Sequence, residues 1–259
     1  MTSMTVDAPA SNQDGALAFL DAEKARIELD ARLRFPDLAR GLIERMAAVR
    51  PIRVLEIGAG RSPLFDPATL PAGVTYVIQD VIAEELELCP YAVERACFDA
   101  CGPVPDLAPV DLVLSRMVAE HLPDAAGFYR LQAAVMTPGA LYLHLHPTLF
   151  AFPFLLNYML PSAVAEWIVE TLYPHRRADG QEPVFPAHYN WCTGLERELD
   201  RRRALGFDRA ERIRLFRHGY YVGLPPLDRL QRRWAAFACA QNWNLFTAYA
   251  VDYGRRAAR

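Results

Sequence analysis

The feature that most constrains the fold is an apolar strand that runs directly into two closely spaced glycines. The segment 53–62 reads RVLEIGAGRS, with Glu56 two residues before Gly58 and Gly60 two residues after it. Because glycine has no Cβ, the backbone can turn sharply here and approach a ligand closely. An apolar strand followed by such a turn usually begins a nucleotide-type site at the carboxyl end of a parallel sheet. The segment therefore predicts an α/β fold with a ligand site at this edge.

Two kinds of ligand use this geometry, and the neighbouring residues separate them. A dinucleotide site carries a third glycine three residues after the second, where this chain has Pro63. Glu56 places a carboxylate at the turn, which disfavours a bound pyrophosphate and suits a ligand with an ammonium group. We therefore expect a cationic ligand rather than NAD. A tight turn that binds no ligand is the alternative.

Composition narrows the class of protein. The chain has 259 residues, of which 52% are apolar, so it can bury the core of one large domain. A net charge of −3 gives no electrostatic basis for a nucleic-acid partner. Its five cysteines include no C-x-x-C pair and no histidine spacing typical of zinc, so we expect reduced thiols, no bound metal and a cytoplasmic location. Residues 1–15 lack the features of a signal peptide and are expected to be disordered.

The order of apolar segments predicts a doubly wound sheet. Helices within 16–50 are followed by a domain, 51–259, in which five strands alternate with helices and two antiparallel strands come last. The predicted strands are 53–57, 74–78, 93–98, 111–116, 141–146, 210–216 and 244–251. A capping box between Thr193 and Glu196 would begin a helix at 194–205.

Four motifs resemble those of class I S-adenosylmethionine (SAM)-dependent methyltransferases. EIGAG at 56–60 is similar to the family's first motif, E/D-x-G-x-G. DLVLSRMVAEHLPD at 111–124 is similar to its D-L-V-x-S strand followed by E-H-L-P-D, and MTPGA at 136–140 to its L-K-P-G-G turn. FPAHYNWCT at 185–193 resembles an F-P-x-x-Y-x-x-x-T signature of the type 11 branch. The resemblance covers most of the chain, from about residue 36 to about residue 253.

This resemblance implies a Rossmann-like, seven-stranded sheet of order 3-2-1-4-5-7-6, with SAM as cofactor and S-adenosylhomocysteine as product. It implies that Glu56 faces the methionyl end of SAM, while Asp80 holds the ribose hydroxyls and Asp99 binds the adenine amino group. Ser115 and Arg116 would form the floor beside the methyl group. The full set expected to bind the cofactor is Glu56, Gly58, Ala59, Gly60, Asp80, Val81, Asp99, Ser115 and Arg116.

The stretch 131–165 contains no Asp, Glu, Lys or Arg. Its prolines cut it into pieces too short to span a bilayer, so we expect no membrane span. Within it, 149–160 is expected to be an apolar lid over a substrate pocket, or a homodimer surface buried against a second copy of the chain. Peripheral contact with lipid is the less favoured alternative. The lid and substrate insertion as a whole is expected at 147–193.

Three residues are candidates for chemistry on the methyl acceptor. His146 is expected at the carboxyl end of the fifth strand, where it would meet substrate. His146 and His188 are the candidates for a general base, because histidine can be neutral near pH 7. Tyr189 would orient an acceptor hydroxyl. The alternative for the aromatic residues around Tyr189 is that they pack the following helix in place.

Together these features predict an enzyme. The resemblance implies transfer of a methyl group from SAM, by in-line displacement, to a small apolar or aromatic molecule. The alternative is a catalytically weak protein of the same fold that acts as a partner or regulatory subunit. The residues do not indicate whether oxygen, nitrogen, carbon or sulfur is methylated.

Overall fold

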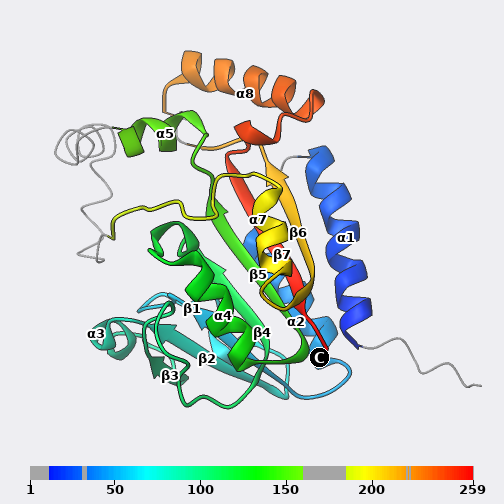
Figure 1. The fold of residues 1–259 in the computed structure, drawn as a ribbon, viewed down its shortest axis with the longest axis vertical. Helices are drawn as coiled ribbons and strands as arrows, with labels where there is room; N and C mark the ends of the chain where they lie inside the picture. Colours follow the sequence, from blue (N-terminus) through cyan, green and yellow to red (C-terminus); the bar gives the residue numbers. More distant parts are fainter. Residues whose placement is uncertain (1–11, 31–33, 160–184, 220, 222, 259) are drawn as a thin grey trace, which may run out of the picture.

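The computed structural model describes residues 12–30, 34–159, 185–219, 221 and 223–258. Its strands form one sheet of order β3-β2-β1-β4-β5-β7-β6 (Figure 1). β7 is antiparallel to both of its neighbours, and the other strand pairs are parallel. The predicted fold class and strand order are confirmed. The strands are β1 Ile52–Ile57, β2 Val74–Asp80, β3 Glu94–Cys97, β4 Val110–Arg116, β5 Met136–Pro147, β6 Phe207–Leu215 and β7 Tyr249–Arg256.

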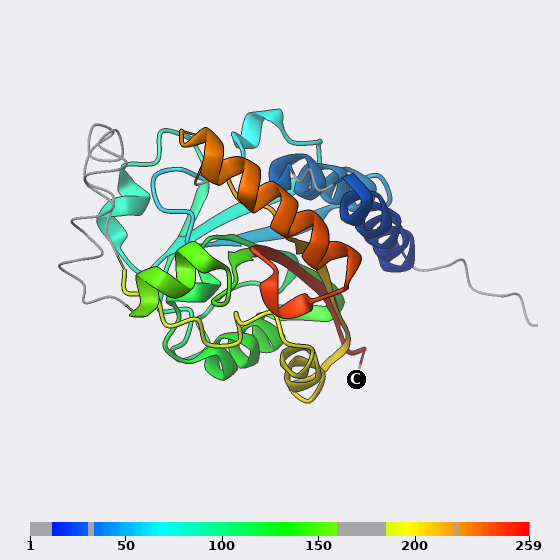
Figure 2. The same ribbon diagram turned by 90° about the horizontal axis from the view of Figure 1, so that it is seen from above.

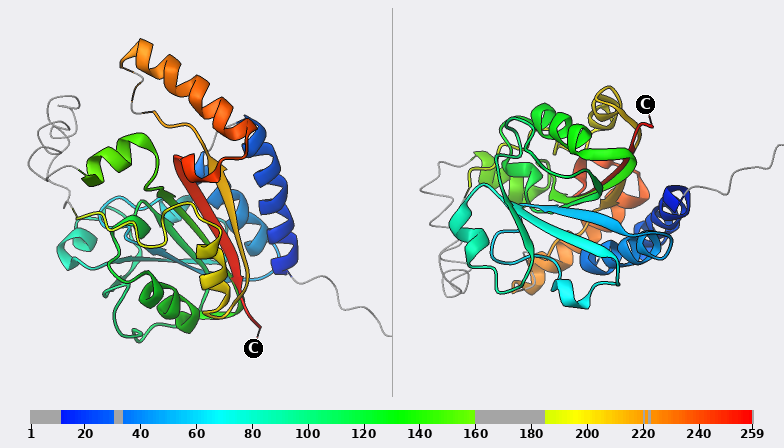
Figure 3. Two further views of the ribbon diagram at one scale, coloured as in Figure 1. Left: turned by 45° about the horizontal axis from the view of Figure 1, so that its top comes forward. Right: turned by 90° about the horizontal axis from the view of Figure 1, so that it is seen from below.

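Helices lie on both faces and at one end of this sheet. The α-helices are α1 Asn12–Asp30, α2 Phe35–Ala47, α3 Ala83–Glu87, α4 Ala125–Val135, α5 Phe152–Met159, α7 Arg197–Arg203 and α8 Pro225–Ala240. Short 3-10 turns are η1 Pro67–Thr69, η2 Ala119–His121 and η4 Asn244–Phe246. Figures 2 and 3 show α5 and α8 at the same end of the molecule, the end at which β5 leads into α5.

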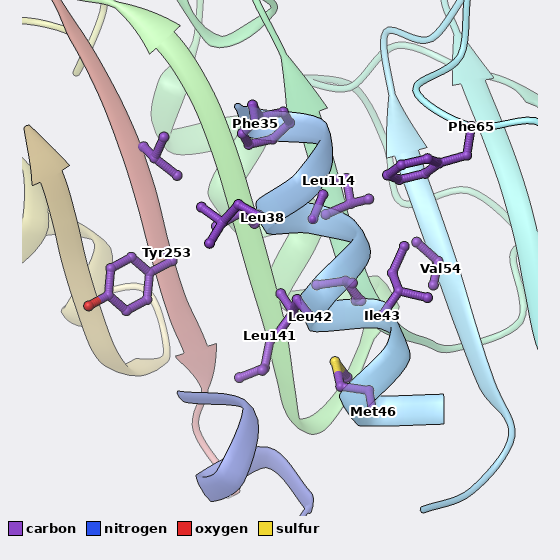
Figure 4. Close-up of a cluster of buried hydrophobic side chains, with 14 of the residues drawn as sticks. Phe35, Leu38, Leu42, Ile43, Met46, Val54, Phe65, Leu114, Leu141 and Tyr253 are labelled. Carbon is purple, nitrogen blue, oxygen red and sulfur yellow. The ribbon is translucent and has the colours of Figure 1, made fainter. Parts of the chain in front are cut away.

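The central strands are apolar on both faces because helices cover both. Successive residues alternate between two cores, so that Val54 faces α2 and Leu55 belongs to the core beneath α4. Figure 4 shows Leu42, Ile43 and Met46 of α2 over the first face. This two-sided burial fixes the register of the parallel strands, and therefore fixes which residues stand at their carboxyl ends.

Several predicted boundaries differ from the structure. α1 begins at Asn12, inside the segment expected to be disordered. α7 begins at Arg197 rather than at Gly194, and Thr193 donates its backbone N–H to Glu198 at 2.9 Å, so the predicted capping box with Glu196 is wrong. Residues 244–246 form a 3-10 turn, and the final strand runs from 249 to 256 instead.

The predicted insertion 147–193 is described only at its two ends, because residues 160–184 lie outside the described residues. The described ends are α5 and the loop 185–193. No helix in the described ranges is long and apolar enough to cross a membrane. None of the five cysteines, all of which lie in the described ranges, forms a disulfide. Within the described part of the chain, no three His, Cys, Asp or Glu side chains are grouped so as to hold a metal ion.

Candidate functional site

The glycine turn after β1 is held by a buried residue of the neighbouring strand. The Gly58 N–H donates to Oε1 of Gln79 at 3.1 Å, and the Ala59 N–H donates to the Gln79 carbonyl oxygen at 2.9 Å. Gly58 and Gly60 have φ values of +68° and +49°, in the left-handed region that favours glycine. A Cβ at Gly58 would also clash with the side chain of Val118. The sharp turn predicted from the two glycines is therefore present.

Glu56 is buried beneath this turn. Its carboxylate accepts hydrogen bonds from the Leu64 backbone N–H at 2.9 Å and from the Tyr76 hydroxyl. Burial raises the pKa of Glu56 to about 6, although these bonds and the positive charge of Arg116 oppose the shift. Glu56 therefore ties the loop after the glycine turn to β2. Contact between Glu56 and a methionyl group would need the loop backbone or a water molecule as intermediary.

Two carboxylates stand at the carboxyl ends of the adjacent strands β2 and β3. Oδ1 of Asp80 accepts the Ile82 N–H at 3.0 Å, and Oδ1 of Asp99 accepts the Cys101 N–H at 2.8 Å. In both residues the turn that follows fixes one oxygen and leaves the second to accept another bond. Oδ2 of Asp80 lies 3.3 Å from the position that a Cβ on Gly60 would take. A ligand hydroxyl at the glycine turn would therefore meet the Asp80 carboxylate.

A third carboxylate beside the turn, Glu85 of α3, is already paired. Nε and Nη2 of Arg61 donate to its two oxygens at 2.6 and 2.5 Å, and these bonds hold the pKa of Glu85 below its usual value. Because the pair uses both Glu85 oxygens, Asp80 is better placed to accept hydrogen bonds from a ligand at Gly60.

Exposed apolar side chains lie at the same edge of the sheet. Val81 is 51% exposed and directly follows β2, and Met117 is 37% exposed and directly follows β4. Met117 has φ of +59°, an uncommon conformation for a residue with a Cβ, and such strained residues gather at functional sites. Apolar side chains at the edge of the sheet that also carries Asp80 and Asp99 suit an adenine ring joined to a ribose. Sequence reasoning did not include Met117, and its position directly after a strand was the available signal.

Ser115 and Arg116 are the last two residues of β4, and their side chains differ in exposure to solvent. Ser115 is fully buried, and its Oγ lies 2.8 Å from Nδ1 of His144. Nε2 of His144 in turn lies 3.0 Å from Oε1 of Gln132, and burial lowers the pKa of His144 to about 3. Arg116 is exposed, with Nη2 3.5 Å from the Ser62 carbonyl oxygen. The expected floor is corrected accordingly, because the Ser115 side chain faces the core while Arg116 reaches the edge.

His146 is fully buried at the end of β5. Its Nε2 lies 2.8 Å from Oδ2 of Asp252, and its Nδ1 lies 2.9 Å from the Pro147 carbonyl oxygen. Both ring nitrogens are engaged inside the protein, so the structure corrects the expectation that His146 meets substrate. His146 belongs instead to the polar network that joins β5 to β7.

His188 and Tyr189 lie together on the loop 185–193. Their backbone N–H groups both donate to the Glu120 carbonyl oxygen, at 2.7 and 2.9 Å, which docks the loop on η2. The His188 side chain is exposed, whereas the Tyr189 ring is buried and meets Tyr158 of α5 edge-on at 5.9 Å. Trp191 stacks on Tyr129 of α4 at 5.8 Å, and the guanidinium of Arg201 on the following helix lies 5.7 Å from the centre of the Trp191 ring.

Glu120 is a functional candidate that sequence reasoning missed. It is 2% exposed, and its Oε2 has no hydrogen-bond partner among the described residues. Nε2 of the neighbouring His121 lies 3.7 Å from Oε1. Burial raises the pKa of Glu120 to about 8, so the carboxyl group is largely protonated at neutral pH. The sequence did offer one indication of this role, because Glu120 is the carboxylate of the E-H-L-P segment that follows the central strand.

A small apolar cluster adjoins Glu120. Its members come from η2, α5 and the residue before it, the loop 185–193 and the residue before β7: Ala119, Ala151, Phe154, Tyr189, Cys192 and Ala248. The Glu120 charge contributes to the raised pKa of the Cys192 thiol, whose main cause is burial. An unused carboxyl oxygen therefore lies beside apolar side chains.

This chain was compared with protein-family models, curated protein sequences and solved structures. No protein-family model and no curated protein sequence match this chain. Among solved structures, CurJ carbon methyltransferase is similar at 12% identity and a TM-score of 0.51, over 86% of this chain and 54% of that one. Phosphoethanolamine N-methyltransferase 2 of Haemonchus contortus aligns at 15% identity and a TM-score of 0.47, over 80% of this chain and 49% of that one. A SAM-dependent methyltransferase from Archaeoglobus fulgidus aligns at 17% identity and a TM-score of 0.47, over 92% and 99%.

The likeness to CurJ methyltransferase concerns the fold, and this chain spans about half of that structure's length. With the strand order β3-β2-β1-β4-β5-β7-β6, it shows that the chain has the fold of the class I SAM-dependent methyltransferases. The resemblance to the type 11 branch stays a prediction.

Proposed function

We propose that this chain transfers a methyl group from SAM to a small molecule. The observation that carries the proposal is the pair of carboxylates at the ends of β2 and β3, Asp80 and Asp99, each with one oxygen fixed by a backbone N–H and one available. With Val81 and Met117 exposed at the same edge, the residues present fit an adenosine group. When bound, SAM supplies an electrophilic methyl group on a sulfonium, and displacement leaves a neutral thioether.

The residues of this chain have distinct roles in the proposed cofactor site. Asp80 accepts hydrogen bonds from the ribose hydroxyls, and Asp99 accepts one from the adenine amino group. Arg116 is exposed, with Nη2 3.5 Å from the Ser62 carbonyl oxygen just after the glycine turn, and it pairs with the methionyl carboxylate. Glu56 and Gln79 hold the turn in shape from beneath, as their bonds to Leu64, Gly58 and Ala59 indicate.

The acceptor site in this proposal lies between η2, α5 and the loop 185–193. Glu120 donates its carboxyl proton in a hydrogen bond to a polar group of the acceptor, and the apolar cluster around Cys192 contacts the rest of the molecule. His188 is the exposed base on the loop, and Tyr189 shapes the wall. This arrangement favours a small, partly apolar or aromatic acceptor, as the sequence predicts.

Calorimetric titration with SAM tests the cofactor assignment. We expect a dissociation constant in the micromolar range for the unmodified protein and no measurable binding of NAD. Asp80→Asn should weaken SAM binding at least tenfold, roughly 1.4 kcal/mol. Asp106→Asn, which removes an exposed carboxylate between β3 and β4, is the matched control and should bind as the unmodified protein does. Absence of SAM binding to the unmodified protein would favour the alternative role as a partner or regulatory subunit.

A further inference from the structure

α8 carries its large apolar side chains on the outside. Leu230, Trp234 and Phe237 are 63%, 44% and 48% exposed, at the spacing of one helical face. The residues that α8 buries are instead polar or small: Asp228, Gln231, Ala235 and Ala238. An ordinary surface helix has the opposite arrangement, with the apolar stripe turned toward the core. The outer face of α8 is therefore available to something other than this domain.

The exposed surface continues into the turn after the helix. Trp243 lies 5.3 Å from Phe237, and Phe246 lies 5.2 Å from Trp234, measured between ring centroids. Together with Leu230 these four aromatic residues form what we call the α8 aromatic surface. A contiguous apolar area of this kind on a protein surface marks an interaction site.

The charges around the α8 aromatic surface are positive. Arg229, Arg232 and Arg233 are exposed on α8, and the segment 216–248 contains a single acidic residue, Asp228. Asp228 is buried and bonded to Arg232 at 2.6 Å. Two copies of the chain that met through this surface would bring six arginines together without an exposed acid in the segment to pair with them. Charge complementarity therefore favours an anionic occupant over a second copy.

The location of α8 suits a broad, flat occupant. Figures 1 and 2 show α8 as an outermost element at the end of the molecule that also carries α5. Within the described residues α8 packs chiefly against η4, so one side of the helix stands clear of the sheet. A helix with Trp, Phe and Leu on one face and arginines beside them is typical of segments that lie in the interface of an anionic bilayer.

We propose that the α8 aromatic surface binds the surface of an anionic lipid bilayer. Trp234, Phe237 and Trp243 enter the boundary between head groups and acyl chains, while Arg229 and Arg233 contact lipid phosphates. The overall charge of −3 gives no general attraction to anionic surfaces, so binding depends on this local cluster. The proposal does not require methyl transfer, and vesicle binding is measured without cofactor or acceptor.

Co-sedimentation with vesicles tests the proposal on the full chain. We expect sedimentation with vesicles of equal parts phosphatidylcholine and phosphatidylserine, little with phosphatidylcholine alone, and loss of binding as salt concentration rises. Arg233→Gln should weaken partitioning roughly fivefold, and Trp234→Ala about tenfold. Arg130→Gln on α4 and Val49→Ala after α2 remove exposed residues of the same kinds elsewhere and should leave partitioning unchanged. Circular dichroism would check that each variant is folded.

Three outcomes would overturn the proposal. The first is no sedimentation with the anionic vesicles, which would leave an acidic protein as the partner to seek. The second is sedimentation that the control variants reduce as much as Arg233→Gln and Trp234→Ala do. The third is a stable dimer, seen by light scattering, that Trp234→Ala converts to monomer in a protein that binds no vesicles. An unmodified protein that binds SAM but does not bind the anionic vesicles would refute this inference and leave the proposed function standing.

Discussion

Gly58 lies in the left-handed region with φ of +68°, and the Val118 side chain occupies the space that a Cβ would need. We expect Gly58→Ala to lower the free energy of unfolding by about 2–4 kcal/mol, partly from the backbone conformation and partly from the clash. Urea denaturation would measure this loss. Gly219→Ala, where nothing lies within 4 Å of the added Cβ, is the control and should change little.

A double-mutant cycle separates the two causes at Gly58. Combining Gly58→Ala with Val118→Ala removes the clash but not the unfavourable φ, so the double variant should be more stable than the sum of the two single losses predicts. Strictly additive losses would show that Val118 does not restrict the turn.

Glu120 should make stability depend on pH. Its pKa is about 8 in the folded protein because of burial, against an ordinary value of 4.5, so the folded state binds the proton more tightly than the unfolded chain. The stabilising effect of this proton is complete below about pH 4.5 and is lost as the pH rises to about 8. Glu120→Gln keeps a neutral group, so its stability advantage over the unmodified protein should be small near pH 5 and grow to a few kcal/mol as the pH approaches 8.

Urea denaturation of both proteins across this pH range would test the role of Glu120. The comparison isolates Glu120, because Glu56, whose pKa is also raised, is present in both proteins. A difference in stability that does not change with pH would contradict the buried, unpaired state of the Glu120 carboxyl.

At the scale of elements, a buried ionic network attaches α7 to the antiparallel strands. Asp252 of β7 accepts from Arg212 of β6 at 2.5 Å and pairs with Arg202 of α7 at 2.5 Å, and Arg212 also reaches Glu198 of α7 at 3.0 Å. Burial opposes ionisation of Asp252, but the two arginines hold its pKa well below the usual range. The network joins elements that are far apart along the chain.

Asp252→Asn should destabilise the protein by about 3–5 kcal/mol, because it leaves two buried guanidinium groups with one carboxylate between them. Asp200→Asn removes an exposed partner of Arg203 on the same helix, and it should cost less than about 1 kcal/mol. Chemical denaturation at neutral pH would compare the two variants. Equal losses would mean that the buried network contributes no more than a surface pair.

The sequence predicted the elements best where a local pattern specifies them. Short apolar runs and turn signals located β1, β2 and β4, and the glycine turn follows directly from Gly58 and Gly60. The last strand was misplaced because 244–246 forms a turn whose Phe246 packs on Trp234 of α8. That contact comes from tertiary packing, which no local pattern reports.

At the scale of the whole molecule, the candidate site also combines residues that a local pattern identifies with residues whose surroundings depend on tertiary packing. Asp80 and Asp99 were recognisable because each follows an apolar strand, and the sheet brings the ends of neighbouring strands together. His146 was misassigned because its partner Asp252 lies 106 residues further along the chain. Glu120 was missed because its burial depends on the loop 185–193, which the sequence did not locate against η2.

Cofactor binding should stabilise the whole domain if Asp80, Asp99 and Arg116 form one site. A ligand that binds only the folded state at 100 times its dissociation constant adds about 2.7 kcal/mol to the free energy of unfolding. For a domain of this size we expect SAM to raise the melting temperature by roughly 5–10 °C, as measured by differential scanning fluorimetry. Asp80→Asn should lose most of this shift at the same SAM concentration, whereas Asp106→Asn should keep it. An equal shift with NAD, or one that Asp80→Asn leaves intact, would contradict an adenosine site at the ends of β2 and β3.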